Sequence, residues 1–262
     1  MTGLGDTLIA TAVALPALLI VVWLISIPLK DVSIVDIAWG VAIALAGWIA
    51  FGVGGGDPDR ALLMVVLVTL WGGRLAGYIA LRKLKHPGED SRYAAMRKRS
   101  KGNSFVWVSL GKVFLLQAAL AWVIGLVLVG SGTYDGGLGW LDAVGVVLWL
   151  TGMIFEAGGD AQLARFKRDP ANKGKVMNQG LCRFTRHPNY VGDFGVWWGF
   201  YALALSAGAW WTIVAPLIVT ALVTKVSGAA HLEKSTMGER PGYREYVERT
   251  SGFFPRPPKK AV

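Results

Sequence analysis

The chain has 262 residues, 53% of them hydrophobic, and its mean hydropathy is +0.46. This composition is more apolar than a soluble domain needs, and the apolar residues come in long continuous runs, which excludes the alternating pattern of a membrane β-barrel. The net charge of +10 comes from basic clusters between these runs. It therefore belongs to a membrane topology, and no nucleic-acid partner is expected.

Seven apolar runs are expected to cross a membrane as helices, because roughly 20 helical residues span a bilayer and a helix satisfies its own backbone in lipid. In chain order they are Leu8–Leu29, Ile34–Val53, Ala61–Leu81, Phe105–Gly130, Leu138–Phe155, Val191–Ser206 and Trp210–Val226. No Lys or Arg precedes Lys30, and the first run is too long for a signal peptide, so we expect it to be a mature helix. The prediction is an all-α integral membrane protein, a bundle of about seven transmembrane helices in a single domain over residues 1–262.

The connections between the runs differ in charge. Basic clusters follow the third, fifth and seventh runs, whereas the alternate connections contain one basic residue, Arg60. With seven spans the clusters fall on one side, which the positive-inside rule makes cytoplasmic. We therefore predict an outside N-terminus and a cytoplasmic C-terminus. The clusters either only orient the protein and contact anionic lipid, or also hold a polyanionic cofactor.

Polar groups within the spans are costly and usually face a bundle interior or a ligand. Asp36 lies just inside the second run, and Arg74 lies inside the third with Tyr78 one turn further on. One alternative is a structural ion pair between Asp36 and Arg74, and another is that Arg74 snorkels to the interface. The functional interpretation is a polar pocket that is open to the cytoplasm.

The densest polar run covers residues 186–193 and reads Arg-His-Pro-Asn-Tyr-Val-Gly-Asp. Asn189 and Asp193 share a face if a helix begins there, where they either cap the helix or face a ligand. His187 has no second His or Cys at ligand spacing, so no metal is expected. Cys182 is the one cysteine, which excludes an intramolecular disulfide, and we assign it no chemistry. No Gly-x-Gly-x-x-Gly run follows a strand pattern, so any nucleotide needs a helical site.

At these residues the chain resembles the steroid 5α-reductase family, particularly its bacterial relatives, and the sterol C14-reductases, which carry a similar Arg-His-Pro-Asn-Tyr-x-Gly-Asp run. The similarity covers most of the chain and is densest from Asp160 to Pro255. Further matching residues are Gly180-Leu181, Asp36 with Trp39, Trp71 with Arg74, Glu89-Asp90-x-Arg92-Tyr93, and the tail Gly238…Tyr243-x-x-Tyr246…Phe254-Pro255. The resemblance implies a seven-helix bundle, in a bacterial inner membrane, that holds NADPH from the cytoplasmic side. It also implies hydride transfer to a polarised carbon–carbon double bond in a steroid, isoprenoid or other lipid.

Carried over residue by residue, the resemblance implies a substrate site and a cofactor site. Asp36 stands where the family usually has a Glu beside the substrate carbonyl, and we expect burial to keep it protonated as a donor. Trp71 stands where steroid-reducing members have a donor Tyr, which disfavours steroid enones, and Tyr78 is expected to supply a proton. The residues expected to bind NADPH are Arg74, Arg92, Tyr93, Asp160, Lys167, Arg183, Arg186, His187, Asn189, Tyr190, Asp193 and Tyr243. Of these, Arg92, Arg183 and Arg186 suit the phosphates.

Two other functional classes stay open. A similar Arg-His-Pro-x-Tyr run followed by Gly occurs in isoprenylcysteine carboxyl methyltransferases, which use S-adenosylmethionine and have a tail much like Glu233 and Gly238 to Tyr246 here. Asn189 and Asp193 favour the reductase, because the methyltransferase run usually continues with apolar residues. The third class is a non-catalytic lipid- or haem-binding membrane protein, and haem is disfavoured because no His lies deep within a span. The expected partners are a hydrophobic substrate and membrane lipids.

Overall fold

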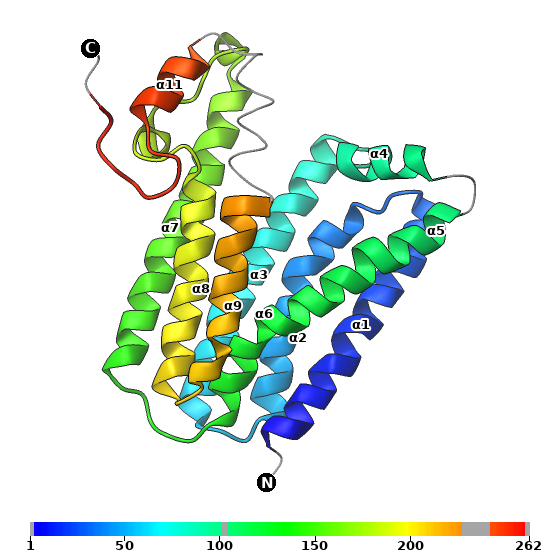
Figure 1. Cartoon of the computed structure of the whole chain (residues 1–262), viewed down its shortest axis with the longest axis vertical. Helices are drawn as coiled ribbons and strands as arrows, with labels where there is room; N and C mark the ends of the chain where they lie inside the picture. Colours follow the sequence, from blue (N-terminus) through cyan, green and yellow to red (C-terminus); the bar gives the residue numbers. More distant parts are fainter. Residues whose placement is uncertain (1–2, 101–103, 227–241, 260–262) are drawn as a thin grey trace. The chain divides into compact units, whose positions relative to one another are not determined.

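The computed structural model describes residues 3–100, 104–226 and 242–259, and in these ranges the chain is helical and contains no β-strand (Figure 1). The all-α prediction is confirmed for these residues. The chain divides into two compact units: unit 1 is Met1–Gly139 with Leu203–Thr212, and unit 2 is Trp140–Ala202 with Ile213–Val262. The single domain over residues 1–262 stays a prediction.

Unit 1 is a bundle in which α2 contacts α1, α3 and α6. Its elements are α1 (Leu4–Leu29), α2 (Ile34–Val53), α3 (Pro58–Lys85), α4 (Ser91–Arg99), α5 (Ser104–Ser109), the π-helical segment η1 (Leu110–Leu115) and α6 (Leu116–Thr133). A Cβ on Gly40 of α2 would lie 2.6 Å from the carbonyl oxygen of Gly72 on α3, so only glycine fits there. Small residues permit such close backbone approach between helices in lipid. The contact places the C-terminal half of α3 beside the start of α2.

Unit 2 is built on the pair α7 and α8. Its elements are α7 (Trp140–Arg168), η2 (Pro170–Asn172), η3 (Gly180–Arg183), α8 (Pro188–Ser206) up to Ala202, α9 (Val214–Ala221), η5 (Leu222–Val226) and α11 (Tyr243–Arg249). The end of α8 from Leu203 and most of η4 (Trp210–Ile213), which connects α8 to α9, belong to unit 1. Three buried glycines of α7, at seven-residue spacing, face α8: Gly145, Gly152 and Gly159. A Cβ on Gly152 would lie 2.5 Å from the backbone nitrogen of Val196, and one on Gly159 would lie 2.9 Å from Pro188. This stripe holds the start of α8 directly against α7.

Five of the described helical segments are long and apolar enough to cross a membrane: Leu4–Leu29, Ile34–Val53, Pro58–Lys85, Ser104–Thr133 and Trp140–Arg168. They contain most of the first five predicted spans, which are confirmed as apolar helices. The sixth predicted span lies in α8, which is 19 residues long, and the seventh overlaps the shorter apolar helix Trp210–Thr224. The count of seven and the sides of the two termini stay predictions.

The helix that contains the fifth predicted span is longer than the span. From its polar composition the segment of roughly Gly158–Tyr190 is expected to be a loop, but α7 continues to Arg168. The residues from Ala161 to Arg165 are good helix formers, and the next proline comes only at Pro170. The polar residues before Arg168 therefore belong to a helix that extends beyond the apolar layer, and they do not form a loop.

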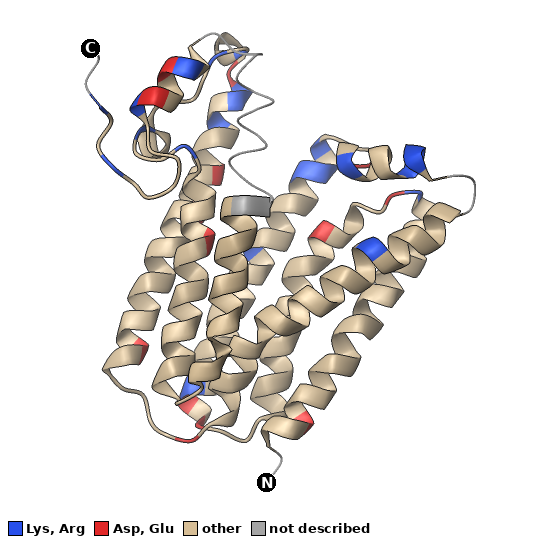
Figure 2. Cartoon of the chain, viewed as in Figure 1, with Lys and Arg blue, Asp and Glu red and all other residues tan. Residues whose placement is uncertain are grey.

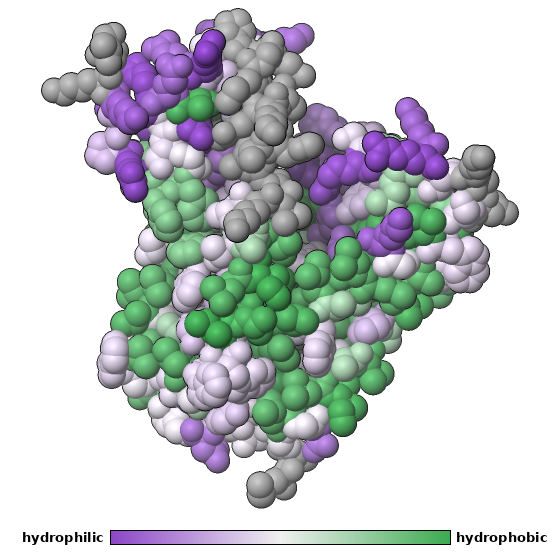
Figure 3. All heavy atoms as spheres, viewed as in Figure 1, coloured by the Kyte–Doolittle hydropathy of each residue, from purple (hydrophilic) through white to green (hydrophobic). Residues whose placement is uncertain are grey.

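In each unit the basic residues gather at helix ends, whereas the flanks of the helices are mainly hydrophobic (Figure 2 and Figure 3). Figure 2 shows Lys and Arg at the C-terminal end of α3 and on α4 in unit 1, and at the C-terminal end of α7 and on α11 in unit 2. The helix flanks are largely hydrophobic (Figure 3), and aliphatic side chains such as Ile9 and Ile154 are about two-thirds exposed, at 66% and 65%. Apolar surface on this scale suits lipid contact. The fold is therefore that of a membrane helical bundle.

Candidate functional site

Asp36 lies in the first turn of α2, and both of its carboxylate oxygens accept hydrogen bonds from α4. Tyr93 Oη donates to Oδ1 over 2.8 Å, and Arg92 Nη2 donates to Oδ2 over 2.9 Å and forms an ion pair with it. The predicted alternative of an ion pair between Asp36 and Arg74 is therefore wrong in the described part of the chain. The partner comes instead from a short helix that folds back onto the start of α2.

The residues just before Tyr93 fix the position of α4. The Asp90 side chain caps the helix by accepting the Arg92 amide hydrogen over 3.0 Å. Glu89 accepts two hydrogen bonds from the Arg97 guanidinium, over 2.9 and 2.7 Å, and one from the Val32 amide over 3.0 Å. Glu89 thereby joins α4 to the turn between α1 and α2. The Glu-Asp-x-Arg-Tyr motif thus positions the Tyr93 hydroxyl and the Arg92 guanidinium to hydrogen-bond to Asp36.

Tyr93 is the centre of a short hydrogen-bond chain. Its side chain is buried, and Gln117 Nε2 on α6 donates to Tyr93 Oη over 3.4 Å. Burial raises the pKa of Tyr93, and the adjacent charge of Asp36 raises it further. The phenol therefore stays protonated at neutral pH and is a hydrogen-bond donor. A cleft of about 320 Å³ opens beside Asp36 and is lined also by Ile79 and Arg82.

The other predicted residues of unit 1 lie on α3. Trp71 is fully buried, with 2% of its surface exposed. The Arg74 guanidinium carbon lies 5.8 Å from the centroid of the Tyr78 ring, a cation–π distance. Their proposed catalytic and cofactor-binding roles stay predictions.

In unit 2, the run of residues 186–193 spans the start of α8. Because α8 begins at Pro188, Asn189 and Asp193 lie inside its first two turns. Asp193 Oδ1 accepts a hydrogen bond from Trp197 Nε1 over 3.0 Å. The His187 imidazole stacks on the Tyr190 ring, with centroids 5.3 Å apart and an interplanar angle of 18°.

Arg186 contacts the segment of residues 242–259, which contains α11 and is called the C-terminal arm below. Its Nη1 donates to the carbonyl oxygens of Val247 and Thr250 over 2.9 and 2.6 Å. The sequence interpretation assigned this guanidinium to a cofactor phosphate. The structure gives it two backbone acceptors on the arm.

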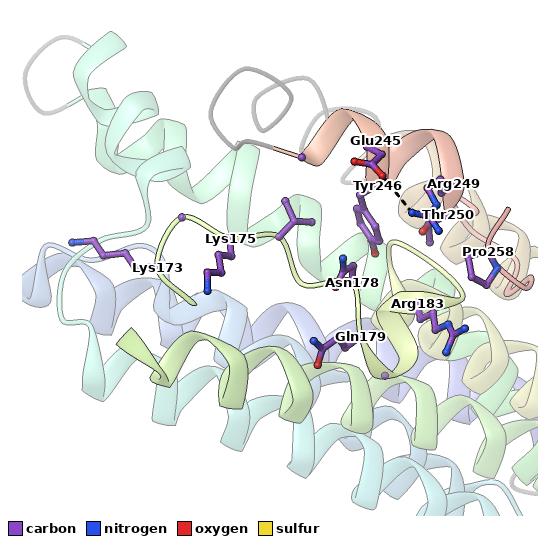
Figure 4. A pocket seen from close by; sticks show the side chains of 14 residues that line it. Lys173, Lys175, Asn178, Gln179, Arg183, Glu245, Tyr246, Arg249, Thr250 and Pro258 are labelled. Atoms are coloured by element: carbon purple, nitrogen blue, oxygen red, sulfur yellow. Dashed lines mark hydrogen bonds and ion pairs between the residues drawn. The ribbon is translucent and has the colours of Figure 1, made fainter. Parts of the chain in front are cut away.

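A cavity of about 860 Å³ lies between the C-terminal arm and residues 173–183 (Figure 4). It is basic, since the residues that line it include four cationic residues and one carboxylate, Glu245, which is 3.3 Å from Arg249. The four cations are Lys173, Lys175, Arg183 and Arg249. Asn178, Gln179 and Tyr246 add neutral polar groups to its wall.

The donor set of this cavity fits a phosphate-bearing nucleotide such as NADPH. Ligand sites typically have volumes of about 300–1,000 Å³. Arg binds phosphate through two parallel N–H groups, and Lys binds it as a point charge. The amide and phenol groups suit ribose hydroxyls and a base. The chemistry that the cavity supports is therefore the binding of a polyanion with a polar, neutral portion.

The predicted cofactor residues fall in several places. Arg183 lines the large cavity, and Lys167 lines a neighbouring cavity of about 360 Å³. Arg92 and Tyr93 contact Asp36 in unit 1. Tyr243 lies on α11 with its ring 6.1 Å from that of Tyr246. The remaining residues, on α7 or at the start of α8 and outside the cavity lining, are Asp160, His187, Asn189, Tyr190 and Asp193.

Among the polar residues that line the cavity, only Arg183 was predicted as a site residue, and the others are Lys173, Lys175, Asn178, Gln179, Glu245, Tyr246, Arg249 and Thr250. In the sequence the two lysines lie in the basic cluster after the fifth run, and Tyr246 lies in the tail motif. A Lys-x-Lys pair in a long connection, followed by a Tyr-x-x-Tyr motif, was the available signal. Within the described residues no group of three or more His, Cys, Asp or Glu lies together to hold a metal ion.

A family model described as "Protein of unknown function (DUF1295)" matches residues 22–250. The chain belongs to the DUF1295 family. The matched range includes both Asp36 with its α4 partners and the cavity up to Thr250. DUF1295 is associated with membrane proteins similar to the steroid 5α-reductases.

Two curated proteins are similar to this DUF1295 chain. An uncharacterized protein of Schizosaccharomyces pombe is 28% identical over 270 residues, which cover 90% of this chain and 76% of that protein. A probable O-methyltransferase, ustE, of Ustilaginoidea virens is 37% identical over 62 residues, covering 24% of this chain and 22% of the other. No solved structure matches the chain.

Proposed function

We propose that the protein is an NADPH-dependent membrane reductase that acts on a carbon–carbon double bond conjugated to a carbonyl in a lipid substrate. The observation that carries the proposal is the basic cavity of unit 2, whose volume and donors fit a phosphorylated nucleotide. The resemblance of the polar run at residues 186–193 to steroid 5α-reductases and sterol C14-reductases supports the same class.

The cavity residues supply the cofactor half of this proposal. Lys173, Lys175, Arg183 and Arg249 bind the phosphates, and Tyr246 borders the neutral part of the ligand. NADPH, when bound, supplies the hydride. A nucleotide with an extra phosphate gains more from four cations than NADH does, which is why NADPH is the proposed form.

Tyr93 and Asp36 supply the substrate half. When an enone is reduced, negative charge builds on the carbonyl oxygen, and a donor placed there in advance lowers the barrier. Tyr93 has one hydroxyl hydrogen, which it donates to Asp36 in this structure. On substrate binding that hydrogen turns to the carbonyl oxygen, and Arg92 continues to balance the Asp36 charge. Tyr93 is thus the hydrogen-bond donor to the carbonyl oxygen, and Asp36 is a positioning residue instead of the donor that the sequence suggested. The proton that completes the reduction at the α-carbon comes from Tyr78 or from water.

The test is identification of ligands that co-purify with the full-length protein, by mass spectrometry after denaturation. The proposal expects NADP(H) in wild-type protein. It expects less in a Lys173→Ala/Lys175→Ala variant, because two of the four cavity cations are gone. Lys167→Ala is the matched control, since Lys167 lines only the neighbouring cavity, whereas Lys173 and Lys175 line both cavities. A nucleotide content that is equal in all three proteins would overturn the placement of the cofactor.

A membrane methyltransferase is the second candidate. The observation that favours it is the 62-residue similarity to a probable O-methyltransferase. S-adenosylmethionine carries no phosphate, so a cavity with four cations suits it less well. Co-purified S-adenosylmethionine or S-adenosylhomocysteine, without nicotinamide nucleotide, would favour this candidate over the reductase.

A further inference from the structure

The C-terminal arm forms much of the basic cavity. Six of the fourteen residues that line the cavity belong to the arm: Gly242, Glu245, Tyr246, Arg249, Thr250 and Pro258. The others lie between Lys173 and Arg183. One of the four cations, Arg249, is therefore present in the cavity only while the arm is docked.

The arm is held by a few hydrogen bonds to residues 182–186. Besides the two bonds from its guanidinium, Arg186 donates its amide hydrogen to the Ser251 carbonyl over 2.9 Å. The fully buried Thr185 donates to the Phe253 carbonyl over 2.6 Å, and Tyr246 Oη donates to the Cys182 carbonyl over 2.6 Å. The arm offers mainly backbone carbonyl oxygens as its acceptors.

The geometry points to Arg186 as a positioning residue that docks the C-terminal arm and so completes the anion-binding cavity. This inference rests on the proposed function of the cavity and deepens it. Both guanidinium contacts are to carbonyls at the end of α11, where the helix leaves such groups without an intrahelical partner. A cation at a helix C-terminus is also favoured by the helix dipole. The Arg of the polar run thus acts on the ligand through the arm.

Cys182 reports whether the arm is docked. It is the one cysteine of the chain, it is buried, and its carbonyl is the acceptor of the Tyr246 hydroxyl. Burial raises the pKa of its thiol to about 11. Because the thiolate is the reactive form, modification by a maleimide at pH 7.5 is slow while the arm is docked. Because Tyr246 of the arm contacts the Cys182 backbone, we expect release of the arm to expose this residue and to speed the reaction.

The experiment measures the rate of Cys182 modification and the NADPH affinity in the same set of full-length variants. Arg186→Ala removes the guanidinium bonds, and Thr185→Val removes the hydroxyl bond without changing charge. Both variants are expected to react with maleimide roughly tenfold faster, since each loses a buried hydrogen bond that holds the arm. Both are also expected to bind NADPH more weakly.

Two controls separate positioning from direct contact with the ligand. Thr185→Ser keeps the hydroxyl and is expected to react at the wild-type rate, which shows that substitution at this buried position is tolerated. Arg183→Ala removes a cation that lines the cavity but holds no arm carbonyl in the described hydrogen bonds. It is expected to weaken NADPH binding and to leave the modification rate unchanged.

The outcomes decide the inference in each case. If Arg186→Ala weakens NADPH binding while Cys182 reacts at the wild-type rate, Arg186 contacts the ligand directly and the inference is overturned. It is also overturned if Thr185→Val reacts faster yet binds NADPH as wild type does. If the wild type binds no NADPH, the proposed function fails, and the docking role of Arg186 is then tested by the Cys182 modification rates alone. Faster modification in both Arg186→Ala and Thr185→Val supports the docking role. Unchanged rates overturn it.

Discussion

Tyr93 donates its hydroxyl hydrogen to Asp36 over 2.8 Å, although the two residues are 57 positions apart in the chain. The same carboxylate holds Arg92 at 2.9 Å. One acidic side chain in the first turn of α2 thus gathers a phenol and a guanidinium from the neighbouring helix α4. This cluster is the proposed substrate side of the reductase.

Replacement of Tyr93 by Phe removes the proposed donor and little else. Loss of one preorganised donor to a developing oxyanion costs roughly 10²- to 10³-fold in kcat. We expect a loss of that order, with NADPH affinity unchanged because Tyr93 is not among the residues that line the cavity. Steady-state kinetics together with nucleotide binding measures both. A variant with wild-type turnover would remove Tyr93 from the mechanism.

Asp36→Asn tests whether Asp36 is a positioning residue. The amide oxygen still accepts from Tyr93, but the ion pair with Arg92 is lost. Because the Arg92 side chain is 66% exposed, the pair resembles a surface salt bridge, and we expect a stability loss of about 0–1 kcal/mol.

Thermal unfolding in detergent gives the stability change for Asp36→Asn, and turnover is expected to fall because the phenol is held less firmly. A stability loss of about 3–5 kcal/mol would instead mark a fully buried pair, and the described geometry would be wrong.

The anchoring of α4 is expected to weaken in acid. Partial burial opposes ionisation of Glu89, but hydrogen bonds from Arg97 and the Val32 amide bring its pKa below the ordinary value of 4.5. A carboxyl whose pKa is lowered on folding stabilises the fold above its unfolded pKa, and that contribution is lost as the pH falls through the folded pKa.

Glu89→Gln should therefore lower the melting temperature at pH 7 and flatten its dependence on pH below about 4.5. Glu248→Gln is the control, because Glu248 is 68% exposed in its pair with Arg244. The same acid sensitivity in Glu89→Gln as in wild type would show that Glu89 does not anchor α4.

The glycine stripe of α7 is expected to tolerate no side chain at its centre. In Gly152→Val a Cβ would lie within 2.6 Å of two backbone atoms of α8, so the helices must separate. Such overpacking costs about 1–3 kcal/mol, and the start of α8 shifts with it.

Gly73→Ala on α3 is the control for the stripe, because no atom lies within 4 Å of its added Cβ. Thermal unfolding compares the two variants. Equal stability of Gly152→Val and wild type would contradict the α7–α8 contact.

The sequence predicts the helices of this protein better than its site. Apolar runs such as Ile34–Val53 can be recognised from their composition, and α2 has those bounds in the structure. The extension of α7 to Arg168 also has a signal in the sequence, the good helix formers before Pro170, but the polar composition of this segment favours a loop.

The partners within the site could not be derived from sequence in the same way. The pairing of Asp36 with Tyr93 depends on where α4 docks, and that follows from Glu89 and Arg97 reaching the α1–α2 turn. The acceptors of Arg186 are backbone carbonyls, which leave no residue signature. A cation in a polar run therefore looks the same whether it binds a phosphate or holds a helix end.

Calorimetric titration of the purified full-length protein with NADPH, NADH and S-adenosylmethionine distinguishes a reductase from a methyltransferase. We expect NADPH to bind at least about tenfold more tightly than NADH, because one more phosphate meets the cations of the cavity and a charge-assisted hydrogen bond contributes about 1.5–3 kcal/mol. We also expect S-adenosylmethionine to bind more weakly than NADPH. Tight binding of S-adenosylmethionine with no binding of either nicotinamide nucleotide would contradict the proposed function.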